Sequence, residues 1–309
     1  MYLEWCICIL CMDIDTLCIT LWVMGAYMWC FIELWLISTA VVAIIGVIIH
    51  AITNDRPVDM TWEHLSCTAL EWAGCLAILP ANIGWFSSNL PPLPPTDCDT
   101  DKNNPHPIIL VPGYSLNKTS FLALRIYLDR LGYSNIWAIN NPVHKDDITE
   151  FIENLHQCVE EYYWRHQRPI TLIGHSMGGL IARHYIAKYG KEKVHSLVTI
   201  GTPWHGTLMH NLGLGKHVHQ MKPHSVFCAN PTPPDCPHLY IWSDRDWIVL
   251  PNSHAVVTGA NQWKISNAGH LGMLGSVAVF KQIFDFLPQK SSVATQAPLS
   301  TESTQHHHV

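Results

Sequence analysis

The sequence is poor in charged residues, and the shortage is concentrated in its first third. Of 309 residues, 14% are charged and 48% are hydrophobic, whereas soluble domains carry roughly 25% charged residues. This composition excludes a disordered chain, a coiled coil and a nucleic-acid-binding protein with a basic face. Residues 1–96 contain eight acidic residues but a single basic one, Arg56. The two parts of the chain are therefore expected to have different surroundings.

Residues 16–53 lack charged residues except for Glu33, which is typical of a membrane segment. About 20 apolar residues are needed to cross a bilayer, and one span is expected between about 29 and 52. A cleaved signal peptide would need a basic start, and no Lys or Arg precedes Arg56. The alternative of a buried core helix is disfavoured because the apolar run is so long.

Two further apolar runs leave the number of spans open, between one and three. Residues 2–24 form one of them and residues 65–86 form the other. Glu71 and Pro80 interrupt the second run, which is therefore either a span or a helix lying on the membrane surface. Residues 1–89 as a whole are interpreted as an N-terminal membrane segment with transmembrane helices.

A proline-rich linker and a polar tail frame the rest of the chain. Residues 90–104 begin with Leu-Pro-Pro-Leu-Pro-Pro and continue with polar and charged residues, a composition that gives a stiff spacer without a core. Residues 291–309, rich in Ser, Thr, Gln and His, are expected to be disordered. The remaining domain comprises residues 105–290.

Within this domain, short apolar runs alternate with longer amphipathic stretches. We expect strands at 107–111, 135–140, 169–174, 194–200, 238–242 and 262–266, and helices at about 119–131, 147–165, 177–189 and 274–287. Thr119 or Ser120 is the expected N-cap of the first helix. Such alternation predicts an α/β fold with a mostly parallel sheet and helices on both faces. Active sites of such sheets lie at the carboxyl ends of the strands.

Residues 174–178, Gly-His-Ser-Met-Gly, match the pattern G-x-S-x-G between a predicted strand and a predicted helix. A serine on so tight a turn exposes its hydroxyl group, and Gly174 and Gly178 let neighbouring backbones approach closely. The start of the helix adds backbone donors for a developing oxyanion. Ser176 is therefore the candidate nucleophile, and the alternative is a structural turn that carries an idle serine.

Five motifs follow one another through the domain: VPGY at 111–114, GHSMGGL at 174–180, IGTPWHG at 200–206, SDRDWIVLP at 243–251 and NAGHLGML at 267–274. Together they resemble bacterial lipases and esterases of the α/β-hydrolase fold, most of all a membrane-anchored lipase-like subgroup. The resemblance implies that Ser176 is the nucleophile and that His270 is the general base. It implies that Asp246 orients the histidine; Asp244 is the rival, disfavoured because the I-V-x-P pattern follows Asp246.

The same resemblance implies an oxyanion hole built from the backbone N–H groups of Met177 and Tyr114. Many relatives have His-Gly in the loop before the second donor, whereas this chain has Pro112 and Gly113. Because the donor is a backbone amide, the hole is expected to persist. Residues 207–237 lack strong periodicity and are interpreted as a lid over the site.

The resemblance implies a serine hydrolase that cleaves carboxylic esters through an acyl-enzyme. It would be similar to triacylglycerol lipases and esterases, and the expected substrates are above all lipid esters. The alternatives are an acyltransferase or thioesterase with the same triad, or a retired hydrolase fold that serves as a membrane-tethered binding protein. The sequence has no nucleotide loop, flavin fingerprint or zinc-type spacing, so neither cofactor nor metal is expected. The expected partners are the acyl-ester substrate and the membrane, not nucleic acid.

The resemblance and the apolar N-terminal part together suggest a bacterial inner membrane. Arg56 lies in the loop between two of the apolar runs, and the positive-inside rule places that loop in the cytoplasm. The hydrolase domain would then lie on the outer, periplasmic side. Cys228 and Cys236 bracket a Pro-rich loop; either they form a disulfide, which would favour an oxidising compartment, or they do not.

Overall fold

The computed structural model describes a single folded region together with a few N-terminal positions. The described residues are 106–141, 146–229 and 231–288, with Glu33, Ile44, Ile48, Ile52 and Glu71. The expected spans within 1–89, apart from those five positions, the linker at 90–104 and the tail at 291–309 lie outside the described residues. No helix within the described ranges combines the length and the apolar character that crossing a bilayer requires.

Strands and helices alternate along the folded region in the predicted order. The elements are β1 (Ile108–Val111), η1 (Lys118–Phe121), α5 (Leu122–Arg130), β2 (Ile136–Ala138), α6 (Ile148–His166), β3 (Ile170–His175), α7 (Met177–Tyr189), β4 (Val194–Ile200), η2 (Leu208–Asn211), α8 (Lys216–His219), β5 (His238–Ser243), η3 (Asn252–Ala255), β6 (Gln262–Ile265), η4 (Gly272–Gly275) and α9 (Val277–Phe286), where η marks a 3₁₀ helix. Each predicted strand and helix is confirmed, with shifts at the ends.

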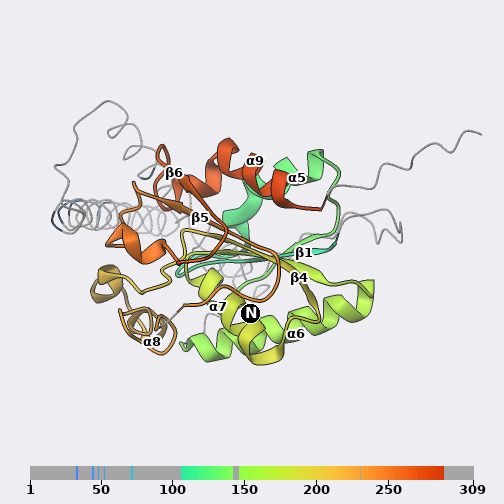
Figure 1. Cartoon of the computed structure of the whole chain (residues 1–309), viewed down its shortest axis with the longest axis horizontal. Coiled ribbons are helices and arrows are strands. Elements are labelled where there is room, and N and C mark those ends of the chain that lie inside the picture. The colour runs from blue at the N-terminus through green and yellow to red at the C-terminus, as the bar shows by residue number, and fades with distance from the viewer. Residues whose placement is uncertain are drawn as a thin grey trace, which may run out of the picture.

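In the part of the chain that the structure describes, the strands form a six-stranded sheet in the order β2-β1-β3-β4-β5-β6, and all neighbouring pairs are parallel. Helices α5 and α9 cover one face of the sheet, and α6 and α7 cover the other (Figure 1). The prediction of a parallel sheet with helices on both faces is therefore confirmed. Because helices cover both faces, the inner strands β1 and β3 are buried at every residue, whereas the edge strand β6 is only partly buried.

The strands divide their side chains between the two faces of the sheet. In β1, Ile109 and Val111 pack in the core layer of α6 and α7, whereas Ile108 and Leu110 pack in the layer of α5 and α9. Successive side chains of a strand point to opposite faces, so this alternation is dictated by the extended backbone. The continuous apolar run is thus explained by two core layers that share one strand.

A 3₁₀ turn precedes two of the predicted helices: η1 runs directly into α5, whereas the extended residue Ser276 separates η4 from α9. The first was expected to be capped by Thr119 or Ser120, and this was wrong: the side chain of Asn117 accepts the N–H of Thr119 and starts η1. The last helix, α9, begins at Val277 because the hydroxyl group of Ser276 accepts an N–H of its first turn. An Asn or Ser side chain that satisfies a free N–H decides where a helix starts.

Candidate active site

Ser176 lies in the turn between β3 and α7 with a strained backbone. Its φ of 54° and ψ of −124° fall in a region that residues with a side chain rarely adopt. Its own amide donates to the carbonyl oxygen of Ile200, at the end of the neighbouring strand β4, at 2.8 Å. Helix α7 begins at the next residue, Met177, whose N–H therefore has no acceptor within the helix.

Glycines allow three backbone segments to meet at this turn. A Cβ atom on Gly178 would overlap a backbone carbonyl oxygen of β1, and one on Gly174 would lie 2.6 Å from the backbone of Gly178. On the other side, a Cβ atom on Gly113 would lie 2.9 Å from the Cβ atom of Ser176. The loop after β1 therefore runs directly beside the serine, and it places the backbone of Tyr114 next to the site.

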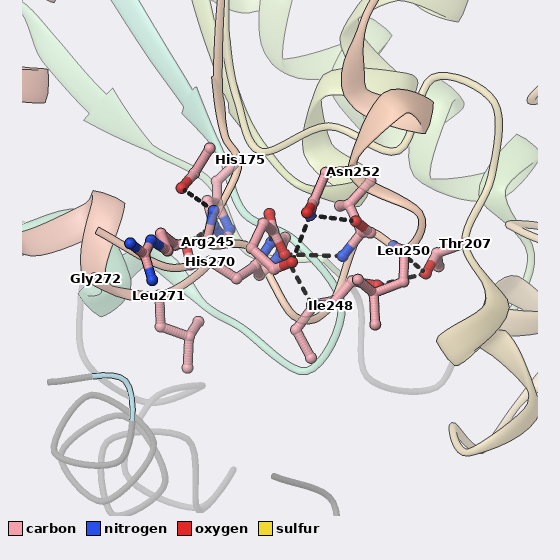
Figure 2. Close-up of polar contacts among 12 residues, drawn as sticks. His175, Thr207, Arg245, Ile248, Leu250, Asn252, His270, Leu271 and Gly272 are labelled. Carbon is pink, nitrogen blue, oxygen red and sulfur yellow. Dashed lines mark hydrogen bonds and ion pairs between the residues drawn. The ribbon is translucent and has the colours of Figure 1, made fainter. Parts of the chain in front are cut away.

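Asp246 and His270 form a buried pair at the ends of β5 and β6. The distance between Oδ2 of Asp246 and Nδ1 of His270 is 2.7 Å, and the side chains are 1% and 4% exposed. The other carboxylate oxygen, Oδ1, accepts the N–H groups of Ile248 and Val249, both at 2.8 Å. Figure 2 shows His270 and Ile248 on opposite sides of this network. The carboxylate is thus fixed so that it bonds Nδ1 and leaves Nε2 for proton transfer.

The surroundings of His270 favour its protonated form. Burial by itself lowers the pKa of His270, but the charge of Asp246, the hydrogen bond to Asp246 and the charge of Glu71 outweigh it, so that the pKa is raised above its ordinary value. A histidine that is stabilised when it carries a proton is suited to take one from a serine hydroxyl group.

Asp244, the rival acid, points to a different partner. Its carboxylate accepts hydrogen bonds from Nζ of Lys264 at 3.1 Å and from the hydroxyl group of Ser266 at 3.2 Å. Of the two acids after β5, the structure therefore brings Asp246 to His270.

Ser176 and His270 reach the same edge of the sheet from different loops. Ser176 is bonded to Ile200, and a Cβ atom on the next residue, Gly201, would lie 3.2 Å from Nδ1 of His270. Both residues are nearly buried, with 6% of the whole serine residue and 3% of the whole histidine residue exposed. The predicted nucleophile, base and acid are thus gathered at the carboxyl ends of β3, β5 and β6.

His175 supports this arrangement, although sequence reasoning gave it no role. Its ring is fully buried, and its Nε2 lies 3.1 Å from the carbonyl oxygen of His270. Burial, together with the charge of His270, lowers the pKa of His175 well below its ordinary value. A neutral ring facing a carbonyl oxygen must carry its proton on Nε2, so His175 donates to the backbone of the candidate base.

The segment predicted as a lid contacts the loop that holds Tyr114. The hydroxyl group of Tyr114 donates to the carbonyl oxygen of Leu214 at 3.2 Å and accepts its N–H at 3.1 Å. The following helix, α8, is held by Asp146, which accepts the N–H of Lys216 at 2.7 Å. Leu214 itself is 82% exposed. The segment is therefore hydrogen-bonded to the loop that carries Tyr114, and its Leu214 exposes an apolar side chain to solvent.

Cys228 and Cys236 are both free thiols, so the disulfide alternative is not realised. Burial raises the pKa of each thiol to about 11. The thiol of Cys228 donates to the carbonyl oxygen of Pro203 at 3.6 Å. Within the described ranges, no group of His, Cys, Asp and Glu side chains is arranged to hold a metal ion.

Two more supporting residues escaped sequence reasoning. The side chain of Asn252 donates to the carbonyl oxygens of Asp246 at 2.5 Å and Val249 at 3.1 Å, and so closes the turn that holds the acid. Nothing in the local sequence distinguishes this Asn from a surface residue. Glu71 is 1% exposed and contacts the loop of His270. The sequence did contain a sign of a special role for Glu71, because it is the one charged residue in the apolar run 65–86.

Comparisons with known proteins concern the folded region. Residues 107–221 match the family model described as the alpha/beta hydrolase fold. No curated protein matches the sequence significantly. Among solved structures, the mature form of the Bacillus licheniformis lipase BlEst2 aligns over 65% of this chain and 97% of its own, with a TM-score of 0.52 and 14% identity. Its propeptide form aligns over 61% of this chain and 51% of its own, with a TM-score of 0.52 and 16% identity. At such identities the likeness concerns the fold alone.

Proposed function

We propose that this chain, which has the α/β-hydrolase fold, is a serine hydrolase that cleaves carboxylic esters through an acyl-enzyme. The observation that carries the proposal is the buried pair of Asp246 and His270 at the same sheet edge as the strained turn of Ser176. Backbone strain persists where the surroundings impose it, and it gathers at active sites. A carboxylate-bonded imidazole is the partner that an activated serine requires.

In the proposed reaction, Oγ of Ser176 attacks the ester carbonyl while Nε2 of His270 takes the hydroxyl proton. Asp246 holds Nδ1 and stabilises the imidazolium ion. The bond to the alcohol then breaks, and His270 returns its proton to the leaving alcohol. In the second half, His270 takes a proton from water as the water attacks the acyl carbonyl. The bond to Oγ of Ser176 then breaks, His270 gives its proton to Oγ, and the carboxylic acid is released.

Each tetrahedral intermediate carries a negative charge on its oxygen atom. Hydrogen-bond donors must stabilise this oxyanion on the side of Ser176 that faces away from His270. The amide of Met177 opens helix α7, and the amide of Tyr114 follows the loop packed against Ser176. We assign the oxyanion hole to these two backbone groups. Such donors are fixed before the reaction, which is the source of their effect on rate.

The substrate that we propose is a lipid ester at a bacterial inner membrane, with residues 1–89 as the anchor. The low charge of that part supports an apolar surrounding. Ile44, Ile48 and Ile52 are helical and 51–72% exposed. Each of these three positions thus presents an apolar side chain to its surroundings.

The periplasmic side for the hydrolase domain rests on Arg56 and the positive-inside rule. The thiols of Cys228 and Cys236 lend it no support, because only a disulfide would have indicated an oxidising compartment. Protease added to intact spheroplasts should cleave the hydrolase domain if it lies outside, and should spare it if it lies in the cytoplasm.

The proposed activity is tested with a fluorophosphonate probe on the full chain in membranes, followed by peptide mapping. We expect label on Ser176, no label in Ser176→Ala, and unchanged labelling in Ser253→Ala, which removes an exposed serine from η3. A series of p-nitrophenyl esters of increasing chain length then defines the acyl preference. Hydrolysis that survives in Ser176→Ala would disprove the assignment of the nucleophile.

A further inference from the structure

Glu71 is a buried carboxylate that the proposed reaction leaves unused. It is the one charged residue within 65–86, and its side chain is 1% exposed. A carboxylate removed from water is costly unless hydrogen-bond donors replace the lost hydration. The identity of those donors therefore indicates what the residue does.

The donors belong to the backbone directly after the candidate base. The N–H of Leu271 donates to Oε2 of Glu71 at 2.9 Å, and the N–H of Gly272 donates to Oε1 at 2.5 Å. These amides open the 3₁₀ turn η4, and the first N–H groups of a helical turn have no acceptor within it. A side chain from 200 residues earlier in the sequence thus supplies the acceptors. Burial raises the pKa of Glu71, and the hydrogen bonds from the N–H groups of Leu271 and Gly272 act against that rise by favouring the carboxylate.

The loop around His270 is shaped to receive this carboxylate. A Cβ atom on Gly269 would lie 2.5 Å from Cδ and from Oε1 of Glu71, and one on Gly272 would lie 2.8 Å from Oε1. The loop therefore has no side chain at either position that faces the carboxylate. The close approach of Glu71 to these two glycines is a second observation, separate from the hydrogen bonds, because it depends on the absence of side chains at 269 and 272 and not on N–H donors.

We propose that Glu71 is a positioning residue for His270, so that the N-terminal part of the chain completes the active site of the hydrolase domain. The inference rests on the proposed function. With both oxygens of Glu71 bonded to the backbone that follows the base, the loop is held where Nδ1 of His270 meets Asp246. The segment read from sequence as an anchor would then also set the activity of the domain.

Several charged or titratable groups face His270 and together determine the direction in which its pKa is shifted. Burial lowers its pKa, whereas Asp246 and then Glu71 raise it and prevail. The buried ring of His175 is neutral, because burial lowers its own pKa. The backbone of Arg245, which Figure 2 labels, is linked to the same loop through Ser243, whose hydroxyl group accepts the N–H of Arg245 and donates to the carbonyl oxygen of Ala268. Removing the charge of Glu71 should therefore lower the pKa of His270 and move the acid limb of the activity profile to lower pH.

The contact is tested by amide hydrogen exchange on the full chain in lipid or detergent. Glu71→Gln keeps the size of the side chain but replaces one accepting oxygen by a donor. We expect exchange at Leu271 and Gly272 to speed up by about 10- to 100-fold, the effect of losing hydrogen bonds to a charged group. The matched control is Glu33→Gln, at an exposed acid in the same part of the chain, which should leave this exchange unchanged.

A variant that merely unfolds is recognised by faster exchange in β3 and β4. In that case Gly272→Ala serves instead, because its Cβ atom presses on Oε1 while Glu71 stays in place. We expect faster exchange at Leu271 in this variant too. Unchanged exchange at these amides in the folded variants would overturn the proposal.

The catalytic consequence is measured on the same proteins. We expect kcat of Glu71→Gln to fall by about 10- to 100-fold with KM changed by less than about twofold, and its acid limb to move to lower pH. Faster exchange with unchanged kcat and pH profile would reduce Glu71 to a structural contact and overturn the positioning role. If the wild type neither reacts with fluorophosphonate nor hydrolyses esters, the proposed function itself fails, and with it the positioning role; exchange at Leu271 and Gly272 still decides whether Glu71 holds the loop.

Discussion

Replacing Asp246 by Asn should disable the site while leaving its shape intact. If the amide oxygen keeps the two 2.8 Å bonds from Ile248 and Val249, the NH₂ group faces His270. That group cannot accept the proton on Nδ1, so the imidazole must present a lone pair there and carry its proton on Nε2. Nε2 is the atom that has to receive the proton of Ser176, and the wrong tautomer blocks the transfer.

The size of the effect follows from the geometry of the pair. The facing atoms of Asp246 and His270 are 2.7 Å apart, and the centres of their delocalised charges are farther apart. Two unit charges about 4 Å apart, at an effective dielectric constant of about 20, interact with about 4 kcal/mol. At roughly 1.4 kcal/mol per factor of ten, this corresponds to about 10³ in rate. The wrong tautomer adds to it, and the same replacement in a serine protease costs about 10⁴ in kcat.

We therefore expect kcat of Asp246→Asn to fall by about 10³- to 10⁴-fold on a p-nitrophenyl ester, with KM nearly unchanged. The matched variant Asp244→Asn breaks a partly exposed pair with Lys264 and should change kcat by less than about threefold. Thermal unfolding of both proteins checks that the fold is retained. Loss of less than a factor of ten in Asp246→Asn, or a larger loss in Asp244→Asn, would refute the assignment of the acid.

Three further predictions follow from the same geometry. The wild-type kcat/KM should fall at acid pH with a midpoint above the ordinary histidine value of 6.5, because the pKa of His270 is raised and only the neutral ring accepts a proton; a midpoint below 6.5 would contradict this. Gly178→Ala should destabilise the fold by about 1–3 kcal/mol through overlap with β1, and lower the Tm by several degrees. Gly275→Ala meets no atom within 4 Å and should leave the Tm nearly unchanged. Cys228 and Cys236 should each be alkylated after unfolding without a reductant, and mass spectrometry that finds label only after reduction would reveal a bridge.

The sequence by itself determined the strands and helices of the hydrolase domain, because their signals are local. Predictions for β4 and α7 match the observed bounds, Val194–Ile200 and Met177–Tyr189. Apolar periodicity and the Gly-Ser-Gly turn act over a few residues, so no knowledge of distant packing was needed. The start of η1 was misjudged because the capping side chain of Asn117 competes with several polar neighbours, and only its orientation settles which residue caps.

The tertiary structure alone decided which of these residues meet. Asp244 and Asp246 stand two residues apart after the same strand, and only the path of the following turn sends one to Lys264 and the other to His270. The sequence could flag Glu71 as a lone charge in an apolar run but could not name its partner, 200 residues away. Periodicity constrains neighbours within an element, whereas contacts between distant segments depend on how the whole chain packs.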